Sequence, residues 1–219
     1  MADVDPILGA AGFHAASNVS RETLARLQSY ADLLTKWQKA INLVGKSTLP
    51  DLWRRHMLDS FQLLSLPSVT GGRWLDLGSG AGFPALVVAI CGDFDVHAIE
   101  SDQRKCLFMG NVSRETSANL TVHRGRIEEI SPFPADVISA RALAPLDRLL
   151  ELAAPFAHAG TEFLFLKGQD VDEELTKASK CWNMEVEKHR SVTSEDGSVL
   201  KITRLCRRSP PEEADNDNG

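Results

Sequence analysis

With 219 residues, 43% of them hydrophobic and 25% charged, the chain has the composition of a globular protein and room for one α/β domain plus a short extension. No stretch approaches the roughly 20 apolar residues of a membrane span, and the acidic start is unlike a secretory signal, so we expect a cytoplasmic protein without a membrane partner. The net charge of −6 argues against a nucleic-acid partner, but residues 209–219 carry four acids and no base, so the remaining body is nearly neutral.

Composition and periodicity divide the chain into four segments. We expect residues 1–19 to be poorly ordered and residues 20–70 to form a helical cap. Ser20 is a good N-cap for a helix to about residue 40, and Pro50 and Asp51 open a second helix to about residue 64. Residues 71–206 are expected to form a Rossmann-like domain, and the acidic residues 207–219 a disordered tail.

Strands and helices alternate through the third segment. Apolar runs predict strands at 74–77, 95–99, 120–123, 135–140, 161–166, 183–192 and 198–206, and helices at 83–90, 102–117, 145–157 and 170–181. Because the last two strands are joined by a turn at Asp196-Gly197, they should form a hairpin. The fold class is therefore α/β, with a seven-stranded, mostly parallel sheet.

The most informative stretch is the glycine-rich loop after the first strand of the sheet. Gly78, Gly80 and Gly82 follow Asp76 and precede a helix with Pro84 near its first turn. A strand, a glycine loop and a helix in this order hold a nucleoside at the carboxyl end of a parallel sheet. The alternative is an ordinary glycine-rich turn with a capping Asp.

Two carboxylates indicate which nucleoside is bound. The dinucleotide fingerprint requires a glycine where this chain has Phe83, and Asp76 would repel a pyrophosphate. S-adenosylmethionine, which carries a sulfonium and an ammonium, suits Asp76 better, and the loop resembles motif I of class I methyltransferases. Glu100 ends the second strand 18 positions after Gly82, close to the spacing of a ribose-binding acid, although a surface Glu remains the alternative.

Cysteine and histidine contribute no recognisable site. The four cysteines are widely separated and none forms a Cys-x-x-Cys pair, and the six histidines lack ligand spacing. We therefore expect no disulfide and no metal.

Several motifs together resemble one family. They are residues 37–44 (WQKAINLV), 55–60 (RHMLDS), 75–84 (LDLGSGAGFP), 100–101 with 104–105, 139–142 (SARA) and 166–168 (LKG). In this order they are similar to the small-subunit ribosomal RNA guanine-N7 methyltransferases, also called glucose-inhibited division protein B, over residues 20–205. One departure is Ala85, where the family usually has glycine, and we expect it to alter packing rather than to abolish binding.

The resemblance implies methyl transfer from S-adenosylmethionine to N7 of a guanine in the decoding-region loop of 16S ribosomal RNA (the guanine 527 class, in the 530 loop), with S-adenosylhomocysteine as product. N7 carries an exposed lone pair, so no general base is required and alignment should dominate catalysis. The sequence agrees, since it lacks both the Asn/Asp-Pro-Pro motif of amine methylation and a Pro-flanked nucleophilic cysteine. The partner would be 16S RNA within a small-subunit particle, and the chain a monomer.

The resemblance also suggests roles for individual residues. The expected cofactor-binding residues are Asp76, Gly78, Gly80, Gly82, Phe83, Glu100, Ile127, Glu128 and Arg141, with Ile127 and Glu128 beside the adenine. The expected catalytic residues are Arg141, Asn42, His56 and Lys167. Arg141 would contact the methionine carboxylate or guanine O6, and Lys167 an RNA phosphate. The polar residues Asn42, His56, Asp59 and Ser60 would cover the site from the cap, unless they only tie cap to sheet.

A basic patch on the cap is expected to meet the RNA backbone as a group: Lys36, Lys39, Lys46, Arg54 and Arg55. Two other readings stay open. A class I enzyme that methylates a small molecule would be indifferent to RNA and to neutralisation of Arg54 and Arg55. A non-catalytic nucleotide sensor or RNA-binding module would not bind S-adenosylmethionine productively.

Overall fold

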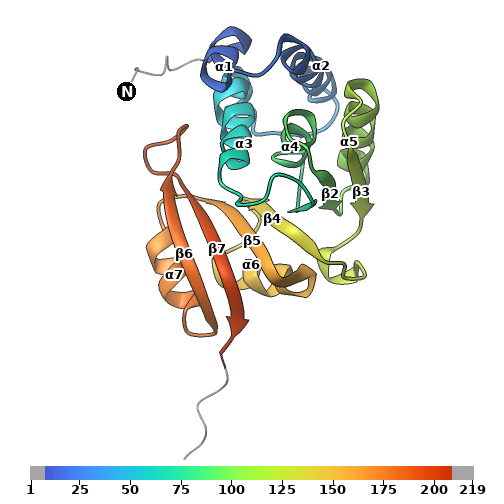
Figure 1. The fold of residues 1–219 in the computed structure, drawn as a ribbon. Helices are drawn as coiled ribbons and strands as arrows, with labels where there is room; N and C mark the ends of the chain where they lie inside the picture. The colour runs from blue at the N-terminus through green and yellow to red at the C-terminus, as the bar shows by residue number, and fades with distance from the viewer. Residues whose placement is uncertain (1–7, 209–219) are drawn as a thin grey trace, which may run out of the picture.

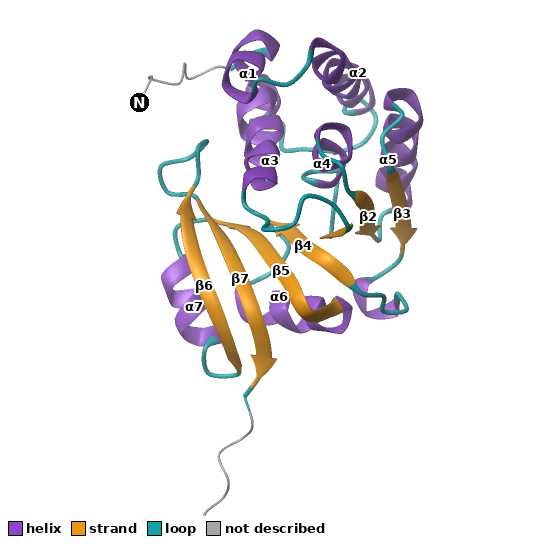
Figure 2. Ribbon diagram, in the orientation of Figure 1, coloured by secondary structure: helices purple, strands orange, loops and turns teal. Residues whose placement is uncertain are grey.

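The computed structural model describes residues 8–208, which form a seven-stranded sheet with helices on both faces (Figures 1 and 2). The strands are β1 (Arg73–Leu77), β2 (Asp95–Glu100), β3 (Leu120–Arg124), β4 (Ala135–Arg141), β5 (Ala157–Lys167), β6 (Trp182–Arg190) and β7 (Ser198–Arg207). The helices are α1 (Ala10–Ser17), α2 (Arg21–Trp37), α3 (Asp59–Phe61), α4 (Ala85–Cys91), α5 (Gln103–Thr116), α6 (Leu146–Ala153) and α7 (Val171–Ala178).

The strand order is β3-β2-β1-β4-β5-β7-β6, and only β7 runs antiparallel to its neighbours β5 and β6. The order reverses between β1 and β4, which is where a doubly wound sheet opens a crevice at its carboxyl edge. The expected fold class and the final hairpin are confirmed. No helix among residues 8–208 is long and apolar enough to cross a bilayer.

Two apolar layers enclose the sheet. One joins the cap and helices α4 and α5 to the sheet, with Trp74, Leu86 and Phe108 fully buried. The other lies between the sheet and helices α6 and α7, around Phe163 and Leu150. Burial of both faces explains why the central strands read as continuous apolar runs rather than as alternating patterns.

The cap departs from the expectation at two places. The segment before residue 20 is not entirely without structure, because α1 lies in it and buries Phe13 against Trp53 and Phe61. The expected second helix is a succession of short turns: Leu49–Asp51 and Gln62–Ser65 are 3₁₀, Trp53–Leu58 is π-helical, and α3 lies between the last two. His56 in the widened π turn and Asp59 at the start of α3 both lie on the side that faces Arg141 of the sheet.

The boundaries of the other expected elements hold to within a few residues. Ser20 caps α2 by accepting from the Thr23 amide, as predicted, and Pro84 precedes α4. The expected acidic tail begins too early, because Arg207 ends β7. Residues 1–7 and 209–219 lie outside the described residues.

Candidate active site

The glycine loop connects β1 to α4 at the reversal of strand order. Gly78, Gly80 and Gly82 all have positive φ angles, of 66°, 58° and 92°. A Cβ on Gly78 or Gly82 would collide with a leucine side chain at 2.6 or 2.4 Å, whereas a Cβ on Gly80 would meet open space. Two glycines therefore serve packing, and Gly80 leaves a place where a ligand can approach the main chain.

Asp76 lies beneath this loop and is fully buried. Its Oδ1 accepts a 2.7 Å hydrogen bond from Ser139, which in turn accepts from the indole of Trp74. Oδ2 has no donor among the described residues. Burial raises the pKa of Asp76 to about 6, and the hydroxyls of Ser79 and Ser139, the charge of Arg141 and the backbone of Ala85 only partly offset this. An unpaired buried carboxylate oxygen is costly unless a cation or donor reaches it.

Glu100 braces the loop from the neighbouring strand. One carboxylate oxygen accepts from the Gly80 amide and the other from the Asp102 amide, both at 2.8 Å. A carboxylate offers about four acceptor positions, so Glu100 can still accept two ligand hydroxyls. Ile127 and Glu128 lie in a 3₁₀ turn after β3. Ile127 is buried, and the exposed Glu128 pairs with Arg148 at 2.5 Å.

A column of aromatic rings ties the cap to the loop. Phe83 stacks on Tyr30 of α2 at 5.0 Å and packs against His56 at the same distance. The hydroxyl of Tyr30 donates to the carbonyl of Ala81 at 2.7 Å. Ala85, the departure noted in the sequence, is fully buried at the start of α4, so its methyl group packs in the core.

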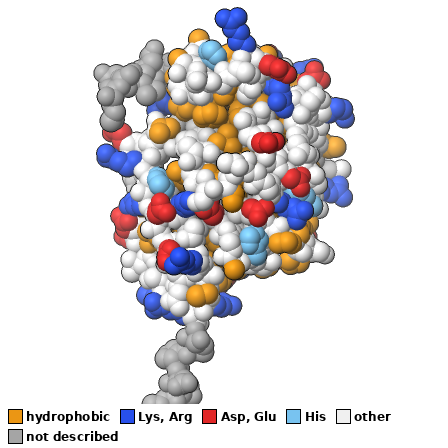
Figure 3. Space-filling model, viewed as in Figure 1, with side chains coloured by type: hydrophobic (Ala, Val, Ile, Leu, Met, Phe, Trp, Pro, Cys, Tyr) orange, Lys and Arg blue, Asp and Glu red, His pale blue; other side chains and the backbone are white. Residues whose placement is uncertain are grey.

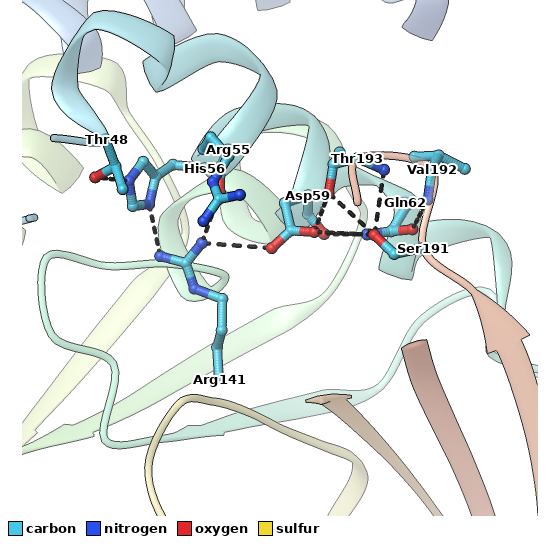
Figure 4. Close-up of polar contacts among 9 residues, drawn as sticks. All are labelled: Thr48, Arg55, His56, Asp59, Gln62, Arg141, Ser191, Val192 and Thr193. Carbon is cyan, nitrogen blue, oxygen red and sulfur yellow. Dashed lines mark hydrogen bonds and ion pairs between the residues drawn. The ribbon is translucent and has the colours of Figure 1, made fainter. Parts of the chain in front are cut away.

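Arg141, the last residue of β4, occupies the junction between the cap and the loop (Figure 4). Its guanidinium lies 5.3 Å from the Phe83 ring and donates to the Arg55 carbonyl and to His56 Nδ1 at 3.0 and 2.8 Å. Because Nδ1 accepts, His56 carries its proton on Nε2 and donates it to the Thr48 hydroxyl, 2.8 Å away. Burial, reinforced by Arg141 and Arg55, lowers the pKa of His56 to about 3.

The hairpin loop between β6 and β7 reaches the same junction. Asp59 lies 3.5 Å from Arg141 and accepts a 2.6 Å hydrogen bond from the hydroxyl of Thr193. Gln62 donates to the same carboxylate and accepts from the amide of Val192 (Figure 4). The cap, the end of β4 and the C-terminal hairpin are thus held by one network. Its residues Asp59 and Arg141 are among the candidates, but the contribution of the hairpin is not expected from the sequence.

Beside Arg141 lies a cavity of about 630 Å³, a size typical of small-ligand pockets. Its walls come from the cap, from the loop after β4, from the end of β5 and from the β6–β7 loop. Ala142 enters it with a φ of 51°, an uncommon angle for a residue with a side chain, and the turn that follows seats Leu143 against Gly78. The cavity and the glycine loop therefore share Arg141 and the turn after it.

Two of the expected catalytic residues are placed elsewhere or otherwise engaged. The ammonium of Lys167 is nearly buried and is already neutralised by Glu174 at 2.6 Å, so it is neither solvated nor free for a phosphate. Asn42 is exposed and lines a separate groove with Lys39, Lys46 and Lys105. The expected basic patch divides in the same way, because Arg54 pairs with Asp51 and Arg55 faces the cavity.

The residues around the loop fit a cationic nucleoside. The open position at Gly80, the unpaired oxygen of Asp76 and the remaining acceptors of Glu100 supply a close approach, an anion and hydroxyl acceptors at the carboxyl ends of β1 and β2. Tyr30 is the residue in contact with the loop that sequence reasoning missed. It is the single tyrosine of the chain, and only its place in the fold connects it to the loop.

Comparison with known protein families identifies the family to which the chain belongs. A family model described as rRNA small subunit methyltransferase G matches residues 23–203. A relative of that name from Paramagnetospirillum magneticum is 55% identical over 191 residues, which cover 87% of this chain and 93% of the relative. The relative from Parvibaculum lavamentivorans is 53% identical over 205 residues and 91% of each chain.

Solved structures agree in fold. Fibrillarin from Aeropyrum pernix, determined with natively bound S-adenosyl-L-methionine, has a TM-score of 0.54 at 17% identity and covers 69% of this chain and 76% of its own. A mutant of MtNAS in complex with S-adenosylmethionine has a TM-score of 0.57 at 12% identity, with 90% and 84% coverage. At these identities the likeness concerns the arrangement of the sheet and helices alone.

Proposed function

The chain belongs to the rRNA small subunit methyltransferase G family, and from that premise we propose how its site transfers a methyl group from S-adenosylmethionine to N7 of a guanine in 16S ribosomal RNA. The observation that carries the proposal is that the glycine loop on one side and the cavity beside Arg141 on the other meet at Phe83, whose ring lies 5.3 Å from the Arg141 guanidinium. One side is built for a cationic nucleoside and the other opens into a cavity. The transfer would take place where the two sides meet.

The chain's own residues would hold the cofactor as follows. Gly80 admits it to the main chain, Asp76 faces its ammonium end, and Glu100 accepts from the ribose hydroxyls. Ile127 would flank the adenine. Glu128 accepts a hydrogen bond from Arg148, and the bound cofactor would take the place of Arg148 as its partner. When bound, S-adenosylmethionine supplies an electrophilic methyl group on a positively charged sulfur.

The substrate side needs a positioned acceptor and no base. Guanine N7 attacks with its own lone pair, and the base carries a positive charge after transfer. His56 is neutral at physiological pH, since its pKa is near 3, so it accepts from Arg141 rather than taking a proton from the substrate. The Arg141 N–H groups not bound to the cap would donate to guanine O6 and align N7. Contact with the methionine carboxylate is the alternative role for this side chain.

The nearly neutral charge of the body favours a shaped target over free RNA. Basic and acidic side chains stand beside one another on the face shown in Figure 3, with no broad basic surface on it. We therefore propose that a monomer of this chain acts on a small-subunit particle, where ribosomal proteins also contribute to recognition. Robust methylation of a short protein-free hairpin would contradict this part of the proposal.

The function is tested by mapping N7-methylguanine along 16S RNA from cells with and without this protein. The expected result is the loss of one N7-methylguanine in the decoding-region loop, restored by the wild-type chain but not by a variant that cannot bind S-adenosylmethionine. An unchanged map, together with methylation of a small molecule by the purified chain, would instead favour a small-molecule methyltransferase.

A further inference from the structure

The loop after α2 is held in a fixed conformation by one side chain, that of Gln38. The Gln38 amide oxygen accepts from the amides of Leu43 and Val44 at 2.9 and 3.0 Å, and its nitrogen donates to the Val44 carbonyl at 2.8 Å. These three bonds fix residues 38–44 in a compact turn. The turn presents Lys39 and Asn42 to solvent on its outer side.

This turn forms one wall of a groove of about 430 Å³, and the start of α5 forms the other. Four cations line it: Lys39, Lys46, Arg104 and Lys105. Among the ion pairs of residues 8–208, only Arg104 has a partner in the groove, Asp102, at 3.7 Å. Asp102 also accepts from two backbone amides as the N-cap of α5, so its charge is shared.

The groove differs from the cavity beside Arg141 in how many of its cations are neutralised by carboxylates. In the cavity, Lys167 pairs with Glu174 and Arg141 is held by His56 and Asp59. Arg55 is the one cation lining the cavity that has no carboxylate partner among the described residues. Of the four cations that line the two hollows without a carboxylate partner, three therefore lie in the groove: Lys39, Lys46 and Lys105. A run of unpaired cations in a concave surface attracts a polyanion.

The groove also adjoins the cofactor crevice. The Asp102 amide donates to the Glu100 carboxylate, which accepts from Gly80 through its other oxygen. A strand lying in the groove would therefore pass directly beside the glycine loop.

We propose that this groove binds the sugar-phosphate backbone of a single-stranded segment of the RNA substrate, with Lys39, Lys46 and Lys105 on phosphates and Asn42 as a neutral donor and acceptor beside them. The inference rests on the proposed function. It assigns to the motif at residues 37–44 a role in holding RNA, in place of the catalytic role expected for Asn42.

The test is a triple variant, Lys39→Gln, Lys46→Gln and Lys105→Gln, assayed on 16S RNA or on small-subunit particles, whichever the wild type methylates. Each lost phosphate contact lowers the dependence of log affinity on log salt by about 0.7 for a single strand, so the slope should fall by about 2. At about 0.1 M salt the KM for RNA should rise at least about tenfold. The affinity for S-adenosylmethionine, measured by calorimetry, should stay unchanged and shows that the variant is folded.

The matched control removes three positive charges from the far end of the molecule, through Lys177→Gln, Lys180→Gln and Lys188→Gln. If the control moves the KM and the salt slope as much as the groove variant does, net charge rather than the groove explains the effect, and the inference is overturned. An unchanged slope in the groove variant overturns it as well. Absence of RNA methylation in the wild type would instead contradict the proposed function, so the two failures are distinguishable.

Discussion

On the cofactor side the site consists mainly of backbone. It contains three glycines within five residues, and the backbone amides of Gly80 and Asp102, which donate to the Glu100 carboxylate. On the substrate side it consists of side chains from three segments far apart in sequence, namely the cap, the end of β4 and the β6–β7 loop. A site of the first kind depends on local conformation, and one of the second kind on how the segments pack. Substitutions should therefore act on binding in the first and on alignment in the second.

The largest effect is expected at Gly80. A valine there forces a branched residue into a positive φ, at a cost of about 1–2 kcal/mol. It also fills the space beside Gly80, where a Cβ would meet no atom closer than the Gly78 carbonyl oxygen at 4.0 Å. We expect Gly80→Val to weaken S-adenosylmethionine binding by about 1,000-fold, or about 4 kcal/mol, in calorimetry. Gly110→Val, on the exposed side of α5 where a Cβ meets nothing within 4 Å, is the matched control and should bind normally. Normal binding by the Gly80 variant would contradict a main-chain cofactor site.

The next effect is expected at Arg141. Arg141→Ala removes the donors that join the cap to the end of β4, and kcat/KM should fall by about 100-fold, the loss typical of one aligned donor. Arg141→Lys keeps the charge but not the fork of donors and should recover little of the rate. Single-turnover methyl transfer with saturating cofactor measures both. Full activity of the lysine variant would show that charge alone suffices on the substrate side.

A pH profile separates the two sides further. The raised pKa of Asp76, about 6, means that the carboxylate which attracts a cation is lost as pH falls through 6. S-adenosylmethionine affinity should therefore be nearly constant above about pH 7 and fall below it by up to tenfold per unit, to about tenfold weaker at pH 5. For the free protein the sign is opposite, because a raised carboxyl pKa stabilises the fold at low pH and this contribution is lost as pH rises from about 4 to 6.

His56 provides the comparison in the same titration. With a pKa near 3 it stays neutral throughout pH 5–7, so it keeps accepting the hydrogen bond from Arg141 over this range. Asp76→Asn is therefore expected to bind weakly and without pH dependence over this range. A wild-type profile that stays flat, or an Asn variant that keeps the wild-type slope, would show that another group is responsible.

The smallest effect is expected at Tyr30. Tyr30→Phe keeps the stack on Phe83 but removes the hydrogen bond to the Ala81 carbonyl, which should cost about 1 kcal/mol of unfolding free energy. Denaturant unfolding and calorimetry should show this loss with only a few-fold weaker cofactor binding. A loss as large as that of the Gly80 variant would mean that the cap, and not the loop itself, determines the cofactor side.

The same division explains how much could be predicted from sequence. The glycine loop, Asp76 and Glu100 lie within 25 residues, and their spacing alone predicted a crevice of this kind. The sheet followed from strands buried on both faces, whose apolar runs are continuous. The position of α1, the divided second helix and the contact of Thr193 with Asp59 depend on packing between segments up to 134 residues apart, which leaves no local pattern.

Lys167 and Asn42 show the limit most clearly. Both stand in motifs of the family. The order of the chain places Lys167 at the carboxyl edge of the sheet and Asn42 in the cap that is expected to cover it. Whether a lysine at that edge is free depends on Glu174, which another helix supplies. Whether Asn42 faces the reaction depends on the turn that Gln38 holds. Neither the pairing of Lys167 with Glu174 nor the turn held by Gln38 can be identified from the sequence without the fold.

The most direct measurement is a crystal structure of the chain soaked with S-adenosylmethionine or its product. The ligand should lie along the glycine loop with its ammonium end toward Asp76 and its ribose hydroxyls on Glu100, and its reactive end should face the cavity beside Arg141. An empty crevice at saturating ligand, or a ligand bound with its sulfur turned away from Arg141, would contradict the account.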